Sequence, residues 1–272
     1  MKFPAVFILA FAILNACNGN NQGQGEPIVT PPESIPPVIG YSIIKTYPHD
    51  TSYFTEGLEF FNDQLLESSG GDTDASPYPS AAGIANLQTG KVDTRILLDR
   101  AIYFGEGITV FNNQLYMLTW KNRKVFVHDA LTFKRIKEFQ TPTEEAWGLT
   151  HDSTNLIMSN GSNSLHFLNP ETLQVTNIVG VIDNNGPVSN INELEYVNGF
   201  IYANQWLTPF ILKIDAKSGK VVGRINMDSI NQEITNKYPA SREMNGIAFN
   251  AKSQTFFITG KKWPFIYEIK LQ

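Results

Sequence analysis

The chain has 272 residues, 42% of them hydrophobic, which is enough for one large domain or two small ones. Its net charge of −5 and the absence of basic runs exclude nucleic acid as a partner. Cys17 is the single cysteine, so disulfide frameworks and cysteine-based metal sites are excluded as well. Short Val-, Ile-, Phe- and Tyr-rich runs broken by Asn, Asp and Gly are typical of an all-β protein.

Residues 1–17 have the pattern of a signal peptide rather than of a part of the folded domain. One lysine precedes an apolar run that is short for a membrane span. The run ends in LNAC, which resembles a bacterial lipobox with Cys17 as the lipidated residue; an ordinary signal peptide with an incidental cysteine is the alternative. Residues 18–39 are rich in Asn, Gln, Gly and Pro and read as a disordered tether. We therefore expect a lipoprotein of the cell envelope, at the outer membrane or facing the periplasm, that meets the membrane only through its lipid.

A repeated unit follows in residues 40–272. The segments FTEGLEF, FGEGITV, AWGLTHD, INELEYV and MNGIAFN each place Leu or Ile in one equivalent position, about 40 to 50 residues apart. A polar turn and two further apolar runs follow each segment, and four of the five units continue into a fourth run. A four-stranded unit of this length predicts a β-propeller blade.

The fifth unit lacks its fourth strand because the chain stops at Gln272. The segment YSIIKTYP (41–48) alternates like a strand and has no partner before the first unit. It can complete the last blade, and ring closure removes exposed sheet edges. We therefore predict an all-β, five-bladed β-propeller closed by an N-terminal strand. A pair of β-sandwiches would leave the period and the terminal mismatch unexplained.

Propeller symmetry predicts where the polar residues of these segments meet. The first strand of each blade lines the central channel, and the second returns to the same mouth, so equivalent residues form two rings. The first ring comprises Phe54, Glu56, Phe104, Glu106, Trp147, Asn192, Glu193 and Asn245. The second comprises Trp120, Asn160, Asn204, Trp206, Lys261 and Trp263. All four tryptophans fall in these rings, which predicts an aromatic-walled, partly polar pocket with Glu106 at its solvated rim.

Structural roles compete for some of these residues. Glu56, Glu193 and Glu195 could accept hydrogen bonds from backbone amides at blade turns. Asn160 and Asn245 could cap turns, and Trp263 could be a packing residue. The four histidines show no metal-ligand spacing, so none is expected to be catalytic.

The motifs FTEGLEF, FGEGIT, WGLTHD, NELEYVNGFIYANQW, MNGIAFN and TGKKWP together resemble the glutaminyl-peptide cyclotransferases of the plant and bacterial type. The resemblance spans the whole predicted propeller. Enzymes of this family are five-bladed propellers that convert N-terminal glutamine to pyroglutamate and release ammonia, and they are unrelated to the zinc-dependent animal enzymes.

The resemblance implies roles for particular residues. The family's essential glutamate matches Glu106, and its substrate-binding amide and amine match Asn192 and Lys261, so these three are the expected catalytic residues. The expected substrate-binding residues are Phe54, Glu56, Phe104, Trp120, Trp147 and Trp206. Glu56 departs from the family, which commonly has Gln there.

This chemistry suits one carboxylate. The α-amine attacks the γ-carbonyl of its own residue, so the site only has to freeze the cyclic conformer and move one proton between two nitrogens. No metal or cofactor is required, and the expected partners are peptides or proteins with N-terminal Gln, bound by a monomer. Two alternatives stay open: a lactonase-like hydrolase holding Ca²⁺ through Glu56, Glu106, Asn192 and Asn245, and a non-catalytic peptide-binding propeller.

Overall fold

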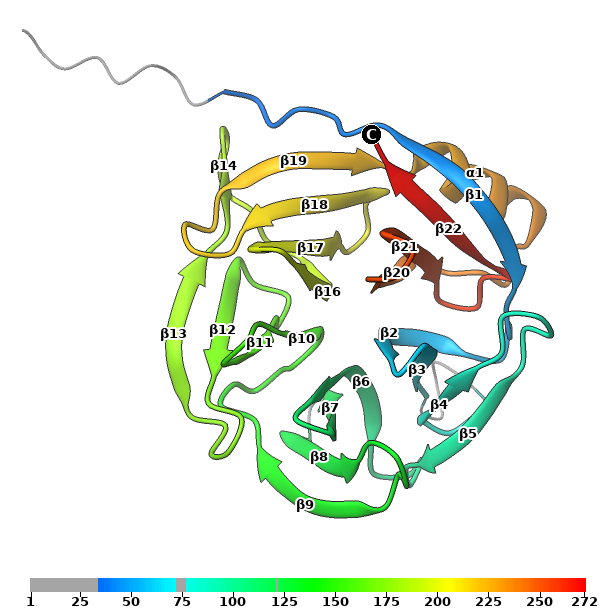
Figure 1. Ribbon diagram of the computed structural model, residues 1–272, viewed down its shortest axis with the longest axis vertical. Helices are drawn as coiled ribbons and strands as arrows, with labels where there is room; N and C mark the ends of the chain where they lie inside the picture. The colour runs from blue at the N-terminus through cyan, green and yellow to red at the C-terminus, as the bar shows by residue number, and fades with distance from the viewer. Residues whose placement is uncertain (1–33, 72–76, 121) are drawn as a thin grey trace, which may run out of the picture. The chain divides into compact units, whose positions relative to one another are not determined.

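The computed structural model describes residues 34–71, 77–120 and 122–272. The predicted signal peptide with Cys17, and residues 18–33 of the predicted tether, lie outside these ranges. Within them, five antiparallel four-stranded sheets are arranged in a ring, with the first strand of each sheet innermost (Figure 1). The predicted five-bladed propeller is thereby confirmed.

The blades follow one another along the chain. Blade 1 contains β2 (Phe54–Phe61), β3 (Gln64–Gly70), β4 (Ala81–Ala85) and β5 (Val92–Leu97). Blade 2 contains β6 (Phe104–Phe111), β7 (Gln114–Trp120), β8 (Lys124–Asp129) and β9 (Arg135–Gln140). Blade 3 contains β10 (Leu149–His151), β11 (Leu156–Met158), β12 (Ser164–Leu168) and β13 (Val175–Gly180). Blade 4 contains β16 (Ile191–Val197), β17 (Phe200–Gln205), β18 (Phe210–Asp215) and β19 (Val221–Asn226). Blade 5 contains β20 (Met244–Asn250), β21 (Thr255–Gly260) and β22 (Phe265–Leu271).

The N-terminal strand closes the ring. β1 (Tyr41–Pro48) pairs antiparallel with β22, from Tyr41 opposite Leu271 to Pro48 opposite Phe265. Blade 5 therefore has the order β20, β21, β22, β1, and its outer strand comes from the other end of the folded sequence (Figure 1). The predicted closure is confirmed.

The last residues before β1 are paired as well. The Ile39 amide donates to the Arg224 carbonyl at 2.8 Å, and the Arg224 amide donates to the Pro37 carbonyl at 2.9 Å. Residues 37–39 thus run beside β19 of blade 4. The end of the predicted tether therefore belongs to the packed structure, a contact that its Pro-rich composition does not indicate.

Two insertions were not predicted. β14 (Ile182–Asp183) and β15 (Gly186–Pro187) form a hairpin between blades 3 and 4. The helix α1 (Asp228–Lys237) lies between blades 4 and 5 and lengthens the interval between their inner strands. It buries only Ile230 and Ile234, too few apolar residues to give a clear helical period in the sequence.

The core lies between the sheets, and the repeated apolar position is its innermost layer. Leu58, Ile108, Leu149, Leu194 and Ile247 are all at most 1% exposed. Adjacent inner strands approach closely at glycines: a β-carbon on Gly148 would lie 2.1 Å from the Asn192 carbonyl oxygen. A β-carbon on Gly107 would lie 2.7 Å from the Leu149 amide nitrogen. The glycine beside Glu106 therefore serves the packing of blade 2 against blade 3.

Buried carboxyl groups join the inner strands of different blades. Glu193 accepts hydrogen bonds from the amides of Leu58 (3.1 Å) and Ile247 (2.8 Å). Glu195 accepts one from the amide of Phe249 at 2.7 Å. Glu59 accepts one from the Thr109 hydroxyl at 2.9 Å. The alternative interpretation of Glu193 and Glu195 as ligands of backbone amides is thus the one that the structure shows.

These groups predict a pH-dependent stability. Burial raises the pKa of Glu59 to about 8 and raises those of Glu193 and Glu195 well above the ordinary value. Between about pH 4.5 and 8 the folded state therefore holds protons that the unfolded state has released. The free energy of unfolding consequently falls as the pH rises through this interval. We expect the Tm, followed by circular dichroism, to fall by about 5 °C or more between pH 5.5 and 8.5. Glu59→Gln should flatten this slope, and a Tm that rises over the interval would contradict the assignment.

Candidate active site

Four polar side chains at the mouth stand at irregularities of the inner strands. The pairing of first and second strands shifts register between Thr55 and Gly57, Gly105 and Ile108, Ile191 and Leu194, and Met244 and Ile247. These intervals contain Glu56, Glu106, Asn192 and Asn245. A β-bulge adds a residue to one strand and redirects a side chain. The repeated bulge therefore breaks the simple alternation of the strand at the positions that carry the polar groups.

Glu56 and Lys261 form the charged centre of the site. The Lys261 Nζ lies 2.9 Å from Glu56 Oε1, and the Asn245 side-chain amide donates to Glu56 Oε2 at 3.1 Å. Glu106 lies beside them and is 5% exposed, and Glu56 is 1% exposed. The predicted gathering of Glu56, Glu106 and Lys261 is therefore seen, but the expectation that Glu106 sits at a solvated rim is wrong. Its position inside the ring removes it from water.

Burial and charge together set the protonation of this centre. Burial raises the pKa of Glu56 to about 7 against the opposing attraction of Lys261. Burial and then the Glu56 carboxylate raise the pKa of Glu106 well above its ordinary value. Burial lowers the pKa of Lys261, but the two carboxylates outweigh it and leave that pKa raised. The Lys261 ammonium and the Glu56 carboxylate balance each other in charge, and the raised pKa of Glu106 favours its protonated form.

Five aromatic side chains form two contact groups, and one of these groups lies against the charged centre. The Phe54 and Phe104 ring centres are 6.2 Å apart, those of Phe104 and Trp120 5.6 Å, and those of Trp147 and Trp206 5.5 Å. The Lys261 ammonium lies 4.7 Å from the Phe54 ring centre. Such walls exclude water and strengthen electrostatic interactions within the site. The structure thus brings together, in two edge-to-face groups, five of the six aromatic residues that the sequence analysis placed at the mouth.

Two asparagines offer unused acceptors. The side-chain oxygens of Asn192 and Asn245 are buried and have no hydrogen-bond partner among the described residues. Buried polar atoms are normally paired, so an unpaired one in a cleft is available to a ligand. Asn192 is therefore suited to accept an N–H of a bound molecule. The sequence analysis placed Asn192 at the mouth, and the resemblance matched it to the family's substrate-binding amide.

Other members of the predicted rings have structural roles. Trp263 is fully buried, and its indole N–H donates to the Arg242 carbonyl at 2.8 Å. Asn160 accepts hydrogen bonds from Ser162, as its alternative role of turn cap requires. Asn204 accepts from the Gly246 amide at 2.9 Å. The prediction that all four tryptophans line the mouth is therefore wrong for Trp263, which packs against Gly260 in the blade core.

Glu243 and Glu145 are neighbours of the centre that sequence reasoning missed. The Glu243 charge raises the pKa values of Glu56 and Lys261, and the Glu145 charge raises that of Glu106. Glu145 also accepts a hydrogen bond from the Trp147 indole at 3.1 Å. Both stand in loops before an inner strand, and no motif in the sequence marks them.

The donor set of this centre does not suit a cation. The Lys261 ammonium already occupies one oxygen of Glu56, and Asn245 donates to the other. Across residues 34–71, 77–120 and 122–272, no group of three or more His, Cys, Asp or Glu side chains could hold a metal ion.

In the same ranges, no helix has the length and apolar character needed to cross a membrane.

The chain is a five-bladed β-propeller that gathers a buried glutamate pair, a lysine and aromatic side chains at one mouth. The family model described as glutamine cyclotransferase matches residues 8–271, and the chain belongs to this family. It is 33% identical over 232 residues to a glutaminyl-peptide cyclotransferase of Arabidopsis thaliana, covering 85% of this chain and 71% of the relative. The crystal structure of Myxococcus xanthus glutaminyl cyclase superposes with a TM-score of 0.78 at 30% identity, covering 87% of this chain and 98% of that one. The resemblance found in the sequence is thereby confirmed.

Proposed function

We propose that this chain is a glutaminyl-peptide cyclotransferase that converts N-terminal Gln of peptides and proteins to pyroglutamate and releases ammonia, with Glu106 as the proton shuttle. The activity follows from the family and from the two relatives named above. The observation that supports the residue roles is the buried Glu56–Lys261 pair, 2.9 Å apart, with Glu106 beside it. One exchangeable proton lies in a site that excludes water.

The reaction transfers one proton between two nitrogens. The α-amine forms a bond to the γ-carbonyl carbon, and the bond from that carbon to the carboxamide nitrogen breaks. The raised pKa of Glu106 favours its protonated form, so Glu106 donates a proton to the leaving nitrogen, which departs as ammonia. It regains a proton from the attacking amine, so the carboxylic acid is restored.

The remaining groups hold the substrate. The amine and the carboxamide of N-terminal Gln are N–H donors, and the unpaired Asn192 oxygen can accept one of them. Phe54, Phe104, Trp120, Trp147 and Trp206 enclose the aliphatic part of the side chain and favour the folded conformer. Lys261, held by Glu56, contributes positive charge where the oxyanion of the tetrahedral intermediate develops.

A direct assay tests the activity. The purified chain without residues 1–33 is incubated with a Gln-initiated peptide, and ammonia and peptide mass are followed. We expect ammonia release in step with a product lighter by one NH₃, and unchanged rates in EDTA. Binding without turnover would favour the non-catalytic alternative, and loss of turnover in EDTA would favour the Ca²⁺-dependent hydrolase.

Replacing Glu56 should change the pH dependence of kcat. In Glu56→Gln the neighbouring carboxylate is lost, so the pKa of Glu106 falls and Lys261 turns to Glu106 as its counterion. Turnover requires protonated Glu106, so the alkaline limb of kcat should move to lower pH by about one unit, with the maximal kcat within about tenfold of wild type. The kcat is measured from pH 5 to 10 at saturating peptide. An unmoved alkaline limb would show that Glu56 does not control Glu106.

We further propose that the mature protein is a monomer anchored by lipidated Cys17 in the cell envelope. The anchor is supported by the LNAC sequence, which follows an apolar run and precedes a Pro-, Gly- and Asn-rich segment. In a Gram-negative host, Cys17→Ser should shift the protein from the membrane to the soluble fraction on ultracentrifugation. Equal membrane association of the two forms would contradict a lipid anchor.

A further inference from the structure

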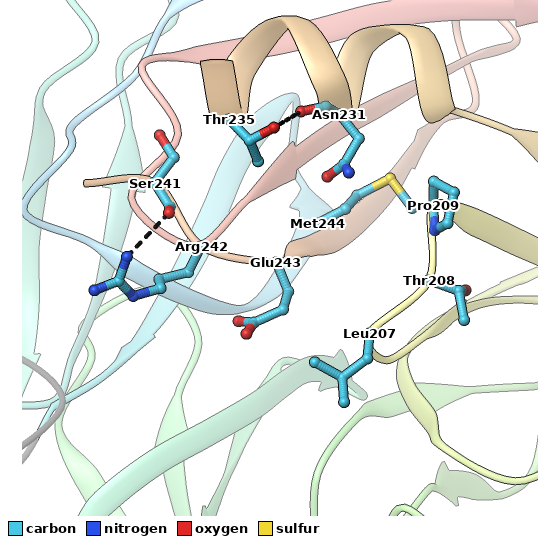
Figure 2. A pocket seen from close by; sticks show the side chains of 9 residues that line it. All are labelled: Leu207, Thr208, Pro209, Asn231, Thr235, Ser241, Arg242, Glu243 and Met244. Carbon is cyan, nitrogen blue, oxygen red and sulfur yellow. Dashed lines mark hydrogen bonds between the residues drawn. The ribbon is translucent and has the colours of Figure 1, made fainter. Parts of the chain in front are cut away.

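A pocket of about 320 Å³ lies between blades 4 and 5 (Figure 2). We call it the blade 4/5 pocket; its walls include Leu207, Thr208, Pro209, Asn231, Glu243 and Met244. Leu207, Thr208 and Pro209 belong to the turn from β17 to β18, and Asn231 belongs to α1. The inserted helix, which completes no blade, thus forms one wall of the pocket.

The blade 4/5 pocket adjoins the active site on both sides. Leu207 directly follows Trp206, whose ring packs on Trp147. On the other side, the Lys261 amide donates to the Glu243 carbonyl at 3.0 Å. Asn245, the residue after Met244, donates to Glu56. Two of its walls, at Leu207 and at Met244, are therefore sequence neighbours of the active-site residues Trp206 and Asn245.

The reaction determines where the rest of the substrate must lie. Both the amine and the side chain of N-terminal Gln are consumed in the ring, so the peptide can leave the site only through the α-carbonyl of that residue. The next Cα is about 3.8 Å further along the chain. The blade 4/5 pocket, whose Leu207 directly follows Trp206 in the chain, is therefore placed to receive the second side chain.

The lining of the blade 4/5 pocket favours a long side chain with a positive end. Leu207, Pro209 and Met244 form an apolar wall, and Figure 2 shows Met244 beside Pro209, with Leu207 across from Glu243. Glu243 makes no ion pair with a described residue, and the Arg242 side chain extends away toward Ser241. An aliphatic stem can cover the apolar wall while its cation meets the Glu243 carboxylate.

We propose that the blade 4/5 pocket binds the second residue of the substrate peptide and selects Lys or Arg there, with Glu243 as the specificity-determining residue. This inference rests on the proposed function. It adds to it a substrate class: peptides that begin with Gln followed by a basic residue.

The test compares kcat/KM for Gln-Lys-Ala, Gln-Glu-Ala and Gln-Gly-Ala amides. Wild type should prefer the Lys peptide over the Glu peptide about fivefold or more, since attraction is exchanged for repulsion. Glu243→Gln should bring this ratio close to one. The Glu243 charge also acts on Glu56 and Lys261. Any effect of the variant on the catalytic centre changes kcat/KM by the same factor for every peptide, so it cancels in the ratio.

Glu144→Gln is the matched control. Glu144 is exposed, lies in the loop before β10 and does not line the pocket, so the same charge change should leave the ratio at its wild-type value. An unchanged ratio in Glu243→Gln, or an equal loss in Glu144→Gln, would overturn the assignment of the pocket.

Leu207→Asn tests the apolar wall separately. Leu207 is 62% exposed and has a φ of 63°, a conformation that Asn tolerates well, so this variant should fold even if Glu243→Gln does not. The Lys-to-Gly peptide ratio should fall about threefold, and an unchanged ratio would overturn the proposal. If wild type cyclises none of the three peptides, the proposed function itself is wrong. If it cyclises all three at equal rates, only the assignment of the blade 4/5 pocket is wrong.

Discussion

Glu106→Gln is expected to lower kcat by about 10²-fold or more, with little change in KM. Gln keeps the size of the side chain and its hydrogen bonding, but it cannot exchange a proton with the two nitrogens. Thermal stability should hold or rise, because a buried carboxyl with a raised pKa costs stability once it ionises. The measurements are steady-state kinetics on a Gln-initiated peptide and thermal unfolding at pH 7 and 8.5.

Glu193→Gln is the matched control for Glu106→Gln. Glu193 is also a buried glutamate at the bulge of an inner strand, but both its oxygens accept backbone amides of other blades. Gln supplies only one acceptor, so this variant should lower the Tm and leave the kcat of the folded enzyme nearly unchanged. A Glu106→Gln enzyme with near-wild-type kcat, or a larger loss of kcat in Glu193→Gln, would rule out Glu106 as the shuttle.

Lys261→Met should have the largest combined effect on stability and activity. Met keeps the apolar stem over Phe54 but removes the cation that lies 2.9 Å from Glu56. Breaking a buried pair typically costs about 3 kcal/mol. Here Glu56 can take up a proton instead, so the loss should be smaller at pH 6 than at pH 8.5. The kcat/KM should fall at least about tenfold, because the positive charge beside the reacting carbonyl is gone.

The control for this variant is Lys252→Met. Lys252 pairs with Asp63 on the surface, where its side chain is 75% exposed, and should affect neither kcat/KM nor the Tm appreciably. A Lys261→Met protein as active as wild type, or one whose loss of Tm does not depend on pH, would show that Lys261 does not balance the Glu56 charge.

The blade count and the ring closure could be read from the sequence because they depend on local patterns. An apolar position that recurs once in every blade, and a strand left over at each end, are properties of residue order alone. Equivalent positions in symmetric blades must meet at one mouth, so Glu106, Glu56, Asn192 and Lys261 could be placed together before any coordinates. This argument predicted which residues lie close together, but not how deeply each is buried or which charges act on it.

The sequence could not distinguish a mouth residue from a core residue within one motif. Trp263 and Trp206 occupy similar places after a second strand, yet Trp263 is fully buried and bonds the Arg242 carbonyl. The difference lies in the segment that packs on each one. That segment comes from another part of the chain, so the motif itself carries no trace of it.

By itself, the sequence determined the all-β class, the five blades, the strand that closes them and the family, since all of these follow from periodicity and motifs along one chain. The tertiary structure alone decided how deeply Glu106 is buried, that it shares the site with a Glu56–Lys261 pair, and that α1 and Glu243 form a pocket beside it. These features depend on desolvation and on charges supplied by different blades. The pKa of a buried carboxyl group depends on its desolvation and on the charges near it, and these are brought together only when the ring of blades is closed.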